Sequence, residues 1–397
     1  MEHLSQRITS LEESATLKMS ALTRELKAKG IDVIDMSIGE PDFPTPKHIK
    51  EAAIKAINDG YTQYPPVPGY PELRKNIATK LKRDNNLDFT AEQIVVSTGA
   101  KQSLMNVLLC LINPGEEVII PAPYWVSYAA MTQLAEGKMV NIFAGVEQDF
   151  KITAAQLETA ITPKTRAFLF SSPCNPTGSV YTKDELKALA DVFAKHPEIY
   201  IISDEIYEYI NFIGAHESIA QFEEIKERVI VVNGFSKGFA MTGWRLGYIA
   251  APLWLAKACT KLQGQFTSGT CSIAQKAAET AISADLTPTY EMRDAFKRRR
   301  ELIVSLLQEI EGFKVSVPTG AFYVFPDVSA YFGKTYNSET IKNAEDFAMF
   351  ILAEANVALV TGDAFGNGNC VRLSFATSDE KIVKAISQIK AALAKLN

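Results

Sequence analysis

The chain has 397 residues and a formal net charge of −5 at pH 7. This length predicts two domains, or one large α/β unit with a smaller one. The negative charge argues against nucleic acid as a main partner, and no apolar run approaches the ~20 residues that span a bilayer. Residues 1–5 lack a signal-peptide pattern, and the five cysteines are scattered. We therefore expect a cytoplasmic protein without disulfides, and the four unclustered histidines predict no metal site.

The first part of the sequence alternates predicted helices with rigid loops. Apolar residues at helical spacing predict a helix over residues 14–29, which Gly30 ends. A short strand, a proline-rich loop, a second helix and a second loop then follow, at 33–38, 39–46, 48–58 and 61–69. Loops of this composition can present backbone N–H groups to a ligand, although most are only connectors.

Strands that alternate with helices dominate the middle of the chain. Residues 94–101 pass from a strand through a small-residue turn into a helix, and such a helix start favours phosphate, although many similar turns bind nothing. Further strand-like runs lie at 117–121, 139–143, 166–171, 199–203 and 229–232. This alternation predicts a mainly parallel sheet, whose ligands bind beyond the carboxyl ends of the strands.

Unusual polar residues follow three of these strands. Asn175 lies in Asn-Pro-Thr-Gly, Asp204 stands three residues before Tyr207, and Lys237 lies in a glycine-containing turn eight residues before Arg245. We expect the amide, the carboxylate with its phenol, and the lysine to meet at one edge of the sheet. A lysine flanked by strands and glycines can be desolvated, which lowers its pKa and frees the amine to act as a nucleophile or Schiff-base former. The alternative is a surface lysine on a turn.

A second region begins near residue 285. Helical spacing over 285–310 includes Arg298–Arg300, which we interpret as one solvated face. A helix near 343–355 and a C-terminal helix with Ser378 as its N-cap follow. Arg372 is the one charge inside an apolar strand. It is either exposed at a strand edge or a clamp for a carboxylate.

Taken together, these motifs resemble the class I pyridoxal-phosphate aminotransferases, most closely the bacterial aspartate aminotransferase subgroup that includes prephenate-accepting enzymes. The likeness runs from about residue 14 to the C-terminus and rests on Tyr64, Ser97–Lys101, Asn175–Gly178, Asp204–Tyr207, Ser236–Arg245 and Val371–Ser374. It implies the α/β fold of pyridoxal-phosphate-dependent transferases, with a mainly parallel mixed sheet flanked by helices and a smaller α+β domain. The boundaries that we predict are 1–45 for the N-terminal arm and part of the small domain, 46–285 for the cofactor-binding domain and 286–397 for the small domain.

The resemblance also implies roles for the site residues. Lys237 would carry pyridoxal 5′-phosphate covalently and later act as the base at the substrate α-carbon. Asp204 would keep the pyridine nitrogen charged, so that the ring draws electrons; the alternative is a helix N-cap. Tyr207 and Asn175 would hydrogen-bond the cofactor's phenolate oxygen, and Trp125 would stack on the ring unless it only packs in the core. The phosphate would be held by Gly99, Ala100, Lys101, Ser236 and Arg245, with Tyr64 supplied by the partner subunit of a homodimer.

For the substrate, the resemblance implies that Arg372 and the backbone of Gly39 bind the α-carboxylate, with Asn175 nearby. Lys101 and Trp125 would receive a distal carboxylate. This predicts a ping-pong transamination of L-aspartate with 2-oxoglutarate to oxaloacetate and L-glutamate. Glu12 stands where some prephenate-accepting relatives carry a basic residue, and its charge puts prephenate activity in doubt.

Several other functions remain open at this stage. They are an aspartate/glutamate–prephenate aminotransferase, an aromatic or alanine aminotransferase, a pyridoxal-phosphate β-lyase of the cystathionine-cleaving type, and the sensor domain of a transcription factor. We do not expect the last, because a DNA-binding module has no room before residue 14.

Overall fold

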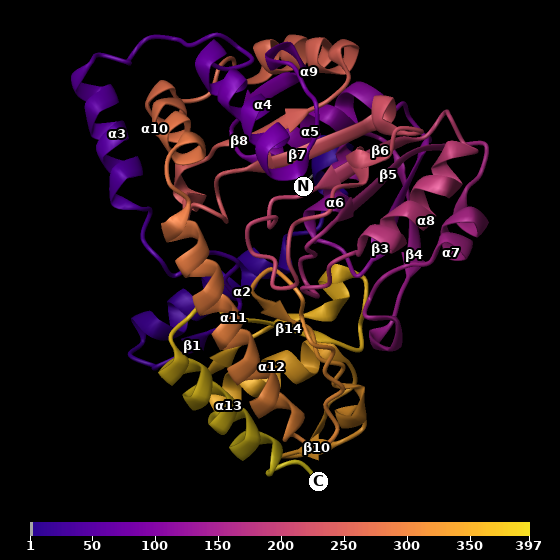
Figure 1. The fold of residues 1–397 in the computed structure, drawn as a ribbon. Helices are drawn as coiled ribbons and strands as arrows, with labels where there is room; N and C mark the ends of the chain where they lie inside the picture. Colours follow the sequence, from indigo (N-terminus) through magenta and orange to yellow (C-terminus); the bar gives the residue numbers. More distant parts are fainter. Residues whose placement is uncertain (1–2) are drawn as a thin grey trace.

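The computed structural model describes residues 3–397, and its centre is a seven-stranded sheet in the order β2-β8-β7-β6-β5-β3-β4 (Figure 1). The strands are β2 (Ile94–Ser97), β3 (Glu117–Ala122), β4 (Lys138–Phe143), β5 (Thr165–Ser171), β6 (Tyr200–Asp204), β7 (Val229–Gly234) and β8 (Gly247–Ala250). Strands β7, β6, β5, β3 and β4 run parallel, whereas β8 pairs antiparallel with both β2 and β7. The predicted mainly parallel mixed sheet is therefore confirmed.

Helices cover both faces of this sheet (Figure 1). One face packs against α3 (Lys47–Asn58), α4 (Pro71–Asn85), α7 (Ala154–Ala160), α8 (Lys183–Ala194) and α10 (Ser272–Ser283). The other packs against α5 (Ala100–Leu111), α6 (Ser127–Leu134) and α9 (Leu253–Phe266). Along β7, Val229 and Val231 belong to the first core while Ile230 belongs to the second. Side chains alternate along a strand, so burial on both faces explains the unbroken apolar runs of the sequence.

A smaller α+β region contains the three-stranded antiparallel sheet β13-β14-β9. Its strands are β9 (Tyr323–Val324), β13 (Val360–Thr361) and β14 (Val371–Ser374), and its helices are α2 (Ala15–Ala28), α11 (Thr287–Gln308), α12 (Ala344–Ala355) and α13 (Asp379–Leu393). In Figure 1, α11 runs from beside the large sheet down into this region. The remaining α-helix and strands are α1 (Gln6–Thr9), β1 (Ile34–Asp35), β10 (Thr335–Tyr336), β11 (Glu339–Thr340) and β12 (Val357–Ala358).

The first part of the chain joins this C-terminal region. Strand β1 pairs in parallel with β12, so Ile34 lies opposite Val357. Ile34 and Met36 are buried in the same core as residues of α11, α12 and α13. This contact brings the loop that begins at Gly39 close to β14. The domain boundaries at 45 and 285 stay a prediction.

The interpretation of Arg298–Arg300 as one solvated face is wrong. Arg299 is 7% exposed and donates to both carboxylate oxygens of Asp42, at 2.7 and 3.0 Å. Arg300 donates to the Pro318 carbonyl at 2.9 Å, and only Arg298 has an exposed side chain. Successive residues lie about 100° apart around an α-helix. Three consecutive arginines therefore point in three directions, one of them into the core.

Local features of the sequence are reproduced in the structure. Helix α2 ends just before Gly30, which has φ of +84°, and the Ser378 hydroxyl accepts from the Lys381 N–H at the start of α13. All five cysteines are free. No helix within residues 3–397 has both the length and the apolar character needed to cross a bilayer.

Candidate active site

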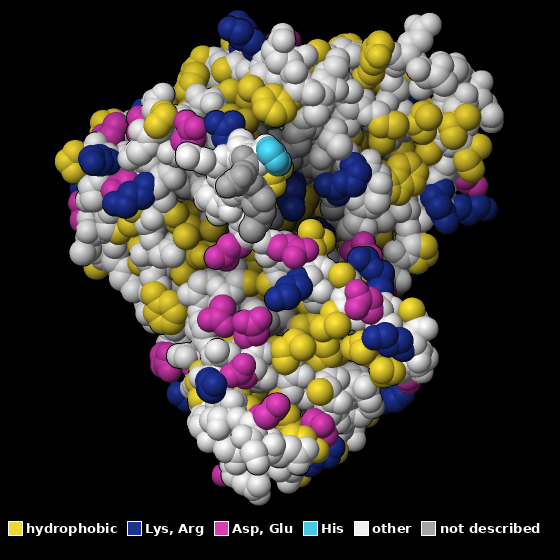
Figure 2. Space-filling view, turned by 180° about the vertical axis from the view of Figure 1, so that it is seen from behind, with side chains coloured by type: hydrophobic (Ala, Val, Ile, Leu, Met, Phe, Trp, Pro, Cys, Tyr) yellow, Lys and Arg dark blue, Asp and Glu magenta, His cyan; other side chains and the backbone are white. Residues whose placement is uncertain are grey.

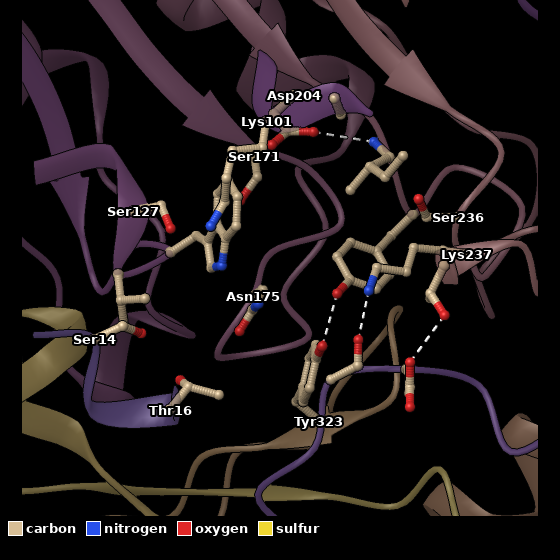
Figure 3. A pocket seen from close by; sticks show the side chains of 18 of the residues that line it. Ser14, Thr16, Lys101, Ser127, Ser171, Asn175, Asp204, Ser236, Lys237 and Tyr323 are labelled. Atoms are coloured by element: carbon tan, nitrogen blue, oxygen red, sulfur yellow. Dashed lines mark hydrogen bonds between the residues drawn. The ribbon is translucent and has the colours of Figure 1, made fainter. Parts of the chain in front are cut away.

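A cavity of about 410 Å³ lies where the carboxyl ends of β5, β6 and β7 meet the smaller α+β region (Figure 3). In Figure 2 the molecular face is hollowed between the larger and smaller parts, with Lys and Arg side chains inside the hollow. The predicted site residues that line the cavity are Gly39, Ala100, Lys101, Trp125, Asn175, Asp204, Tyr207, Ser236, Lys237, Arg245 and Arg372. The structure therefore brings together residues from separate strand ends and from β14.

Lys237 lies in the turn after β7 and points into the cavity (Figure 3). Its side chain is half-buried, but Nζ itself is enclosed: it donates to the Gly39 carbonyl at 2.5 Å and lies 5.6 and 5.8 Å from the ring centres of Tyr207 and Phe322. Burial lowers the pKa of the amine to about 8, although the carboxylate of Glu40 opposes this. Lys237 is therefore not an exposed lysine on a turn.

Asp204 ends β6 and is 4% exposed. Its Oδ1 accepts from the Ile206 N–H at 3.2 Å, so the carboxylate does cap the turn that follows the strand. Its Oδ2 accepts from the Tyr128 hydroxyl at 2.7 Å. Burial raises the pKa of Asp204 to about 6, against the lowering effect of these two hydrogen bonds. The carboxylate is therefore mainly ionised near neutral pH.

Arg372 is 2% exposed, which excludes the alternative of an arginine at a solvated strand edge. Its Nη1 donates to Asn175 Oδ1 at 2.9 Å and its Nη2 to the Ser37 carbonyl at 2.6 Å. The guanidinium carbon lies 4.6 Å from the ring centre of Tyr323 and 4.9 Å from that of Phe365. Its buried Nε has no hydrogen-bond partner among residues 3–397. A buried guanidinium with an unused donor beside a cavity suits a carboxylate ligand.

The N-terminus of α5 faces the turn at Arg245. Gly99 precedes this helix with φ of +83°, and a Cβ there would lie only 2.5 Å from Arg245 Nη2. The guanidinium is held by a bond from Nη1 to the Thr242 carbonyl at 2.8 Å. The first N–H groups of a helix have no partners within it. Together with Ser236, which also lines the cavity, they form a corner suited to a phosphate group.

Lys101 and Trp125 form a further side of the cavity. Lys101 Nζ lies 5.0 Å from the centre of the Trp125 ring. The pKa of this lysine is lowered mainly by burial and to a smaller extent by repulsion from the charge of Arg245. Trp125 is half-buried and lines the cavity, so core packing alone does not describe it.

Tyr64 is not brought into the site by this chain. Its side chain is 95% exposed, and Glu12 is also exposed and does not line the cavity. Sequence reasoning also missed lining residues, namely Ser14, Thr16, Ile38, Glu40, Tyr128, Ser171 and Tyr323 among others. Tyr128 had a signal, because it follows Trp125 by three residues, close to one helical turn. Tyr323 had none, because its partners lie far away in the sequence.

Residues 31–389 match the family model of class I and II aminotransferases. The chain belongs to this family. This aminotransferase is 48% identical over 394 residues to a probable aspartate/prephenate aminotransferase of Rhizobium leguminosarum bv. phaseoli, with 98% of each chain covered. It is 46% identical over 400 residues to the aspartate/prephenate aminotransferase of Cereibacter sphaeroides, with 100% of each covered. Its structure is similar to that of the aspartate aminotransferase from Rhizobium meliloti, with a TM-score of 0.96, 41% identity and 100% of both chains covered. The predicted family and fold class are confirmed.

Proposed function

We propose that this aminotransferase transfers the amino group of L-aspartate to 2-oxoglutarate, giving oxaloacetate and L-glutamate by a ping-pong mechanism. It would use pyridoxal 5′-phosphate held by Lys237. The observation that carries the proposal is the meeting of three groups in one cavity: the enclosed amine of Lys237, the buried carboxylate of Asp204 and the buried guanidinium of Arg372. Together they supply a nucleophile, a counter-charge for a ring nitrogen and a carboxylate clamp.

The residues present fit this cofactor. The corner formed by the α5 N-terminus, Ser236 and Arg245 suits its phosphate, and Asp204 supplies a buried negative charge for its ring nitrogen. Tyr207 and Asn175 line the same cavity and can hydrogen-bond its phenolate oxygen. When bound, the cofactor would draw electrons from the substrate α-carbon.

The proton at the substrate α-carbon is the task of Lys237. Because burial lowers its pKa to about 8, a larger fraction of this amine is uncharged near neutral pH than of an exposed lysine. The uncharged Nζ can accept the proton from the α-carbon of the amino acid. In the second half-reaction it can donate a proton to the α-carbon that comes from the 2-oxo acid. Asp204 stays ionised above about pH 6, as a counter-charge to a protonated ring nitrogen requires.

Two cationic groups support a dicarboxylic substrate. The buried Nε of Arg372 has no partner within the described residues 3–397, and Arg372 would bind the α-carboxylate close to the backbone of Gly39. Lys101 would bind the distal carboxylate beside Trp125, over whose ring its amine lies. A substrate without a distal carboxylate would leave Lys101 without its ion-pair partner, so aspartate and glutamate should be preferred to alanine.

Prephenate is a second candidate substrate, because both relatives described above carry names that include it. Ser14 and Thr16 line the cavity, and Glu12 precedes them as an exposed acid. Its negative charge opposes the ring carboxylate of prephenate. We expect prephenate to be transaminated more slowly than 2-oxoglutarate, and Glu12→Gln to raise the prephenate rate selectively. An unchanged ratio of the two rates would contradict this role of Glu12.

We also propose that the enzyme is a homodimer in the cytoplasm. Tyr64 is 95% exposed and Phe266 is 68% exposed, as expected of side chains that a second subunit covers. We propose that Tyr64 reaches the phosphate in the partner's site. Tyr64→Phe should then weaken cofactor binding while sedimentation velocity still shows a dimer. Unchanged cofactor affinity would remove Tyr64 from the site.

The proposed function is tested by mixing the cofactor-loaded enzyme with single amino acids and following the absorbance of the bound cofactor. Aspartate and glutamate should change this absorbance faster than alanine, and equal rates would refute the dicarboxylate assignment. Lys237→Ala should lose the absorbance of the covalently held cofactor. The matched control is Lys151→Ala, a largely buried lysine that pairs with Glu185 outside the cavity, and it should keep the wild-type spectrum.

A further inference from the structure

Tyr323 connects two parts of the site. It lies on β9, is fully buried and lines the cavity (Figure 3). Its hydroxyl is 2.7 Å from that of Tyr207, and its ring centre is 4.6 Å from the guanidinium carbon of Arg372. A Cβ at Gly39 would lie only 2.6 Å from the Tyr323 hydroxyl, so this approach depends on the glycine. Tyr323 therefore contacts both Tyr207, which we propose hydrogen-bonds the cofactor's phenolate oxygen, and Arg372, which we propose binds the substrate carboxylate.

The hydroxyl of Tyr323 can orient the hydroxyl of Tyr207. Burial raises the pKa of both tyrosines, well above the usual value for Tyr207, so both phenols keep their protons. The charge of Arg372 partly opposes burial at both tyrosines, and either hydroxyl can be the donor across the 2.7 Å between them. If Tyr323 donates to Tyr207, the Tyr207 proton is left to point into the cavity. The two phenols then have a defined order of donation.

The ring of Tyr323 restrains Arg372. The guanidinium lies over this ring and over that of Phe365, while Nη1 and Nη2 donate to Asn175 and Ser37. Stacking of a guanidinium on an aromatic face in a desolvated site is a favourable interaction. This stacking keeps Arg372 Nε in a fixed direction without using any of the hydrogen-bond donors of the guanidinium.

We infer that Tyr323 is a positioning residue with two separable roles: its hydroxyl orients Tyr207 and its ring orients Arg372. The inference rests on the proposed function. Arg372 is then linked to both groups proposed for the cofactor oxygen, directly to Asn175 and through Tyr323 to Tyr207. A carboxylate that binds Arg372 therefore changes the surroundings of the cofactor oxygen by two routes.

Two variants separate these roles. Tyr323→Phe removes the hydroxyl and keeps the ring, whereas Tyr323→Leu removes both. The matched control is Tyr331→Phe, because Tyr331 is buried in the same core but its hydroxyl donates to the Glu311 carbonyl at 2.5 Å, away from the cavity. Cofactor-loaded proteins are titrated with pH while the cofactor absorbance is read, with and without succinate, a dicarboxylate that has no amine. The dissociation constant of succinate is measured in the same cuvette, and thermal unfolding checks that each variant folds.

For Tyr323→Phe we expect a shifted midpoint of the absorbance titration, kcat lower by about threefold to tenfold, and a succinate dissociation constant within about twofold of wild type. For Tyr323→Leu we expect succinate binding that is weaker by about threefold to thirtyfold. Tyr331→Phe should match wild type in all three measurements.

A Tyr323→Phe titration that superimposes on wild type, with and without succinate, would overturn the role of the hydroxyl. Succinate binding by Tyr323→Leu as tight as by Tyr323→Phe would overturn the role of the ring. If the leucine variant does not fold, Tyr323→Met replaces it in this comparison. A wild-type protein that binds no pyridoxal phosphate would refute the proposed function instead, and this is seen before any variant is made.

Discussion

Removal of the Tyr128 hydroxyl should raise the pKa of Asp204 and confine cofactor binding to higher pH. Burial raises the pKa of this carboxyl to about 6, while Tyr128 at 2.7 Å and the Ile206 N–H at 3.2 Å stabilise its ionised form. A hydrogen bond to a charged group contributes about 1.5–3 kcal/mol, and one pKa unit corresponds to about 1.4 kcal/mol. Loss of the Tyr128 bond penalises only the ionised form, so Tyr128→Phe should raise the pKa by about 1 to 2 units. At pH 7 the carboxyl would then be about half to nine-tenths protonated.

The assay is the affinity of the cofactor-free protein for pyridoxal 5′-phosphate, measured by fluorescence quenching across the neutral pH range. Wild-type affinity should fall as the pH drops through about 6, where Asp204 takes up a proton. The same fall should occur about 1 to 2 units higher in Tyr128→Phe. Tyr181→Phe is the control, since it removes another buried hydroxyl, which accepts from the Ile152 N–H at 2.9 Å outside the cavity. Tyr181→Phe should lose affinity over the same pH range as wild type. If Tyr128→Phe does so as well, the role of Tyr128 is refuted.

Three further substitutions test other parts of the molecule. Arg372→Lys loses the fork that holds Asn175 and Ser37, so kcat/KM for aspartate should fall about tenfold to hundredfold; a fall below threefold would contradict the clamp. Lys101→Met should lower kcat/KM for aspartate about tenfold to hundredfold and leave alanine nearly unchanged; equal losses would contradict a role in distal-carboxylate binding. Lys80→Met leaves the buried Glu208 carboxylate without the amine that donates to it. The free energy of unfolding of Lys80→Met, measured with urea, should be lower by about 3–5 kcal/mol, and adding Glu208→Gln should recover part of this loss. A double variant less stable than Lys80→Met would contradict this account.

Much of the fold and about half of the residues that line the candidate site could be predicted before the structure was known. The alternation of strand-like runs with helices predicted a mainly parallel sheet, and Asn175, Asp204 and Lys237 each followed one of these runs. Because parallel strands end at the same edge, their order in the sequence was enough to expect them in one cavity. The structure places all three there.

The failures have a common origin in contacts between distant residues. The sequence shows that Arg299 lies on a helix, but not that this helix packs against the loop that carries Asp42. Likewise, Tyr323 is one aromatic residue among many in an apolar stretch. Arg372 becomes its neighbour when β9 pairs with β14, whereas Tyr207 comes from the turn after β6. The role of Tyr64 in the site of a second subunit stays a prediction.

The amino-acid sequence by itself determined the alternation of strands and helices and the chemical types of the groups at the strand ends, since both follow from short-range periodicity and backbone geometry. Only the tertiary structure decided which of these groups are buried, which atoms they bind and how their pKa values move. Desolvation and hydrogen bonding depend on everything packed around a side chain. For Lys237 and Asp204, those neighbours come from segments far away along the chain.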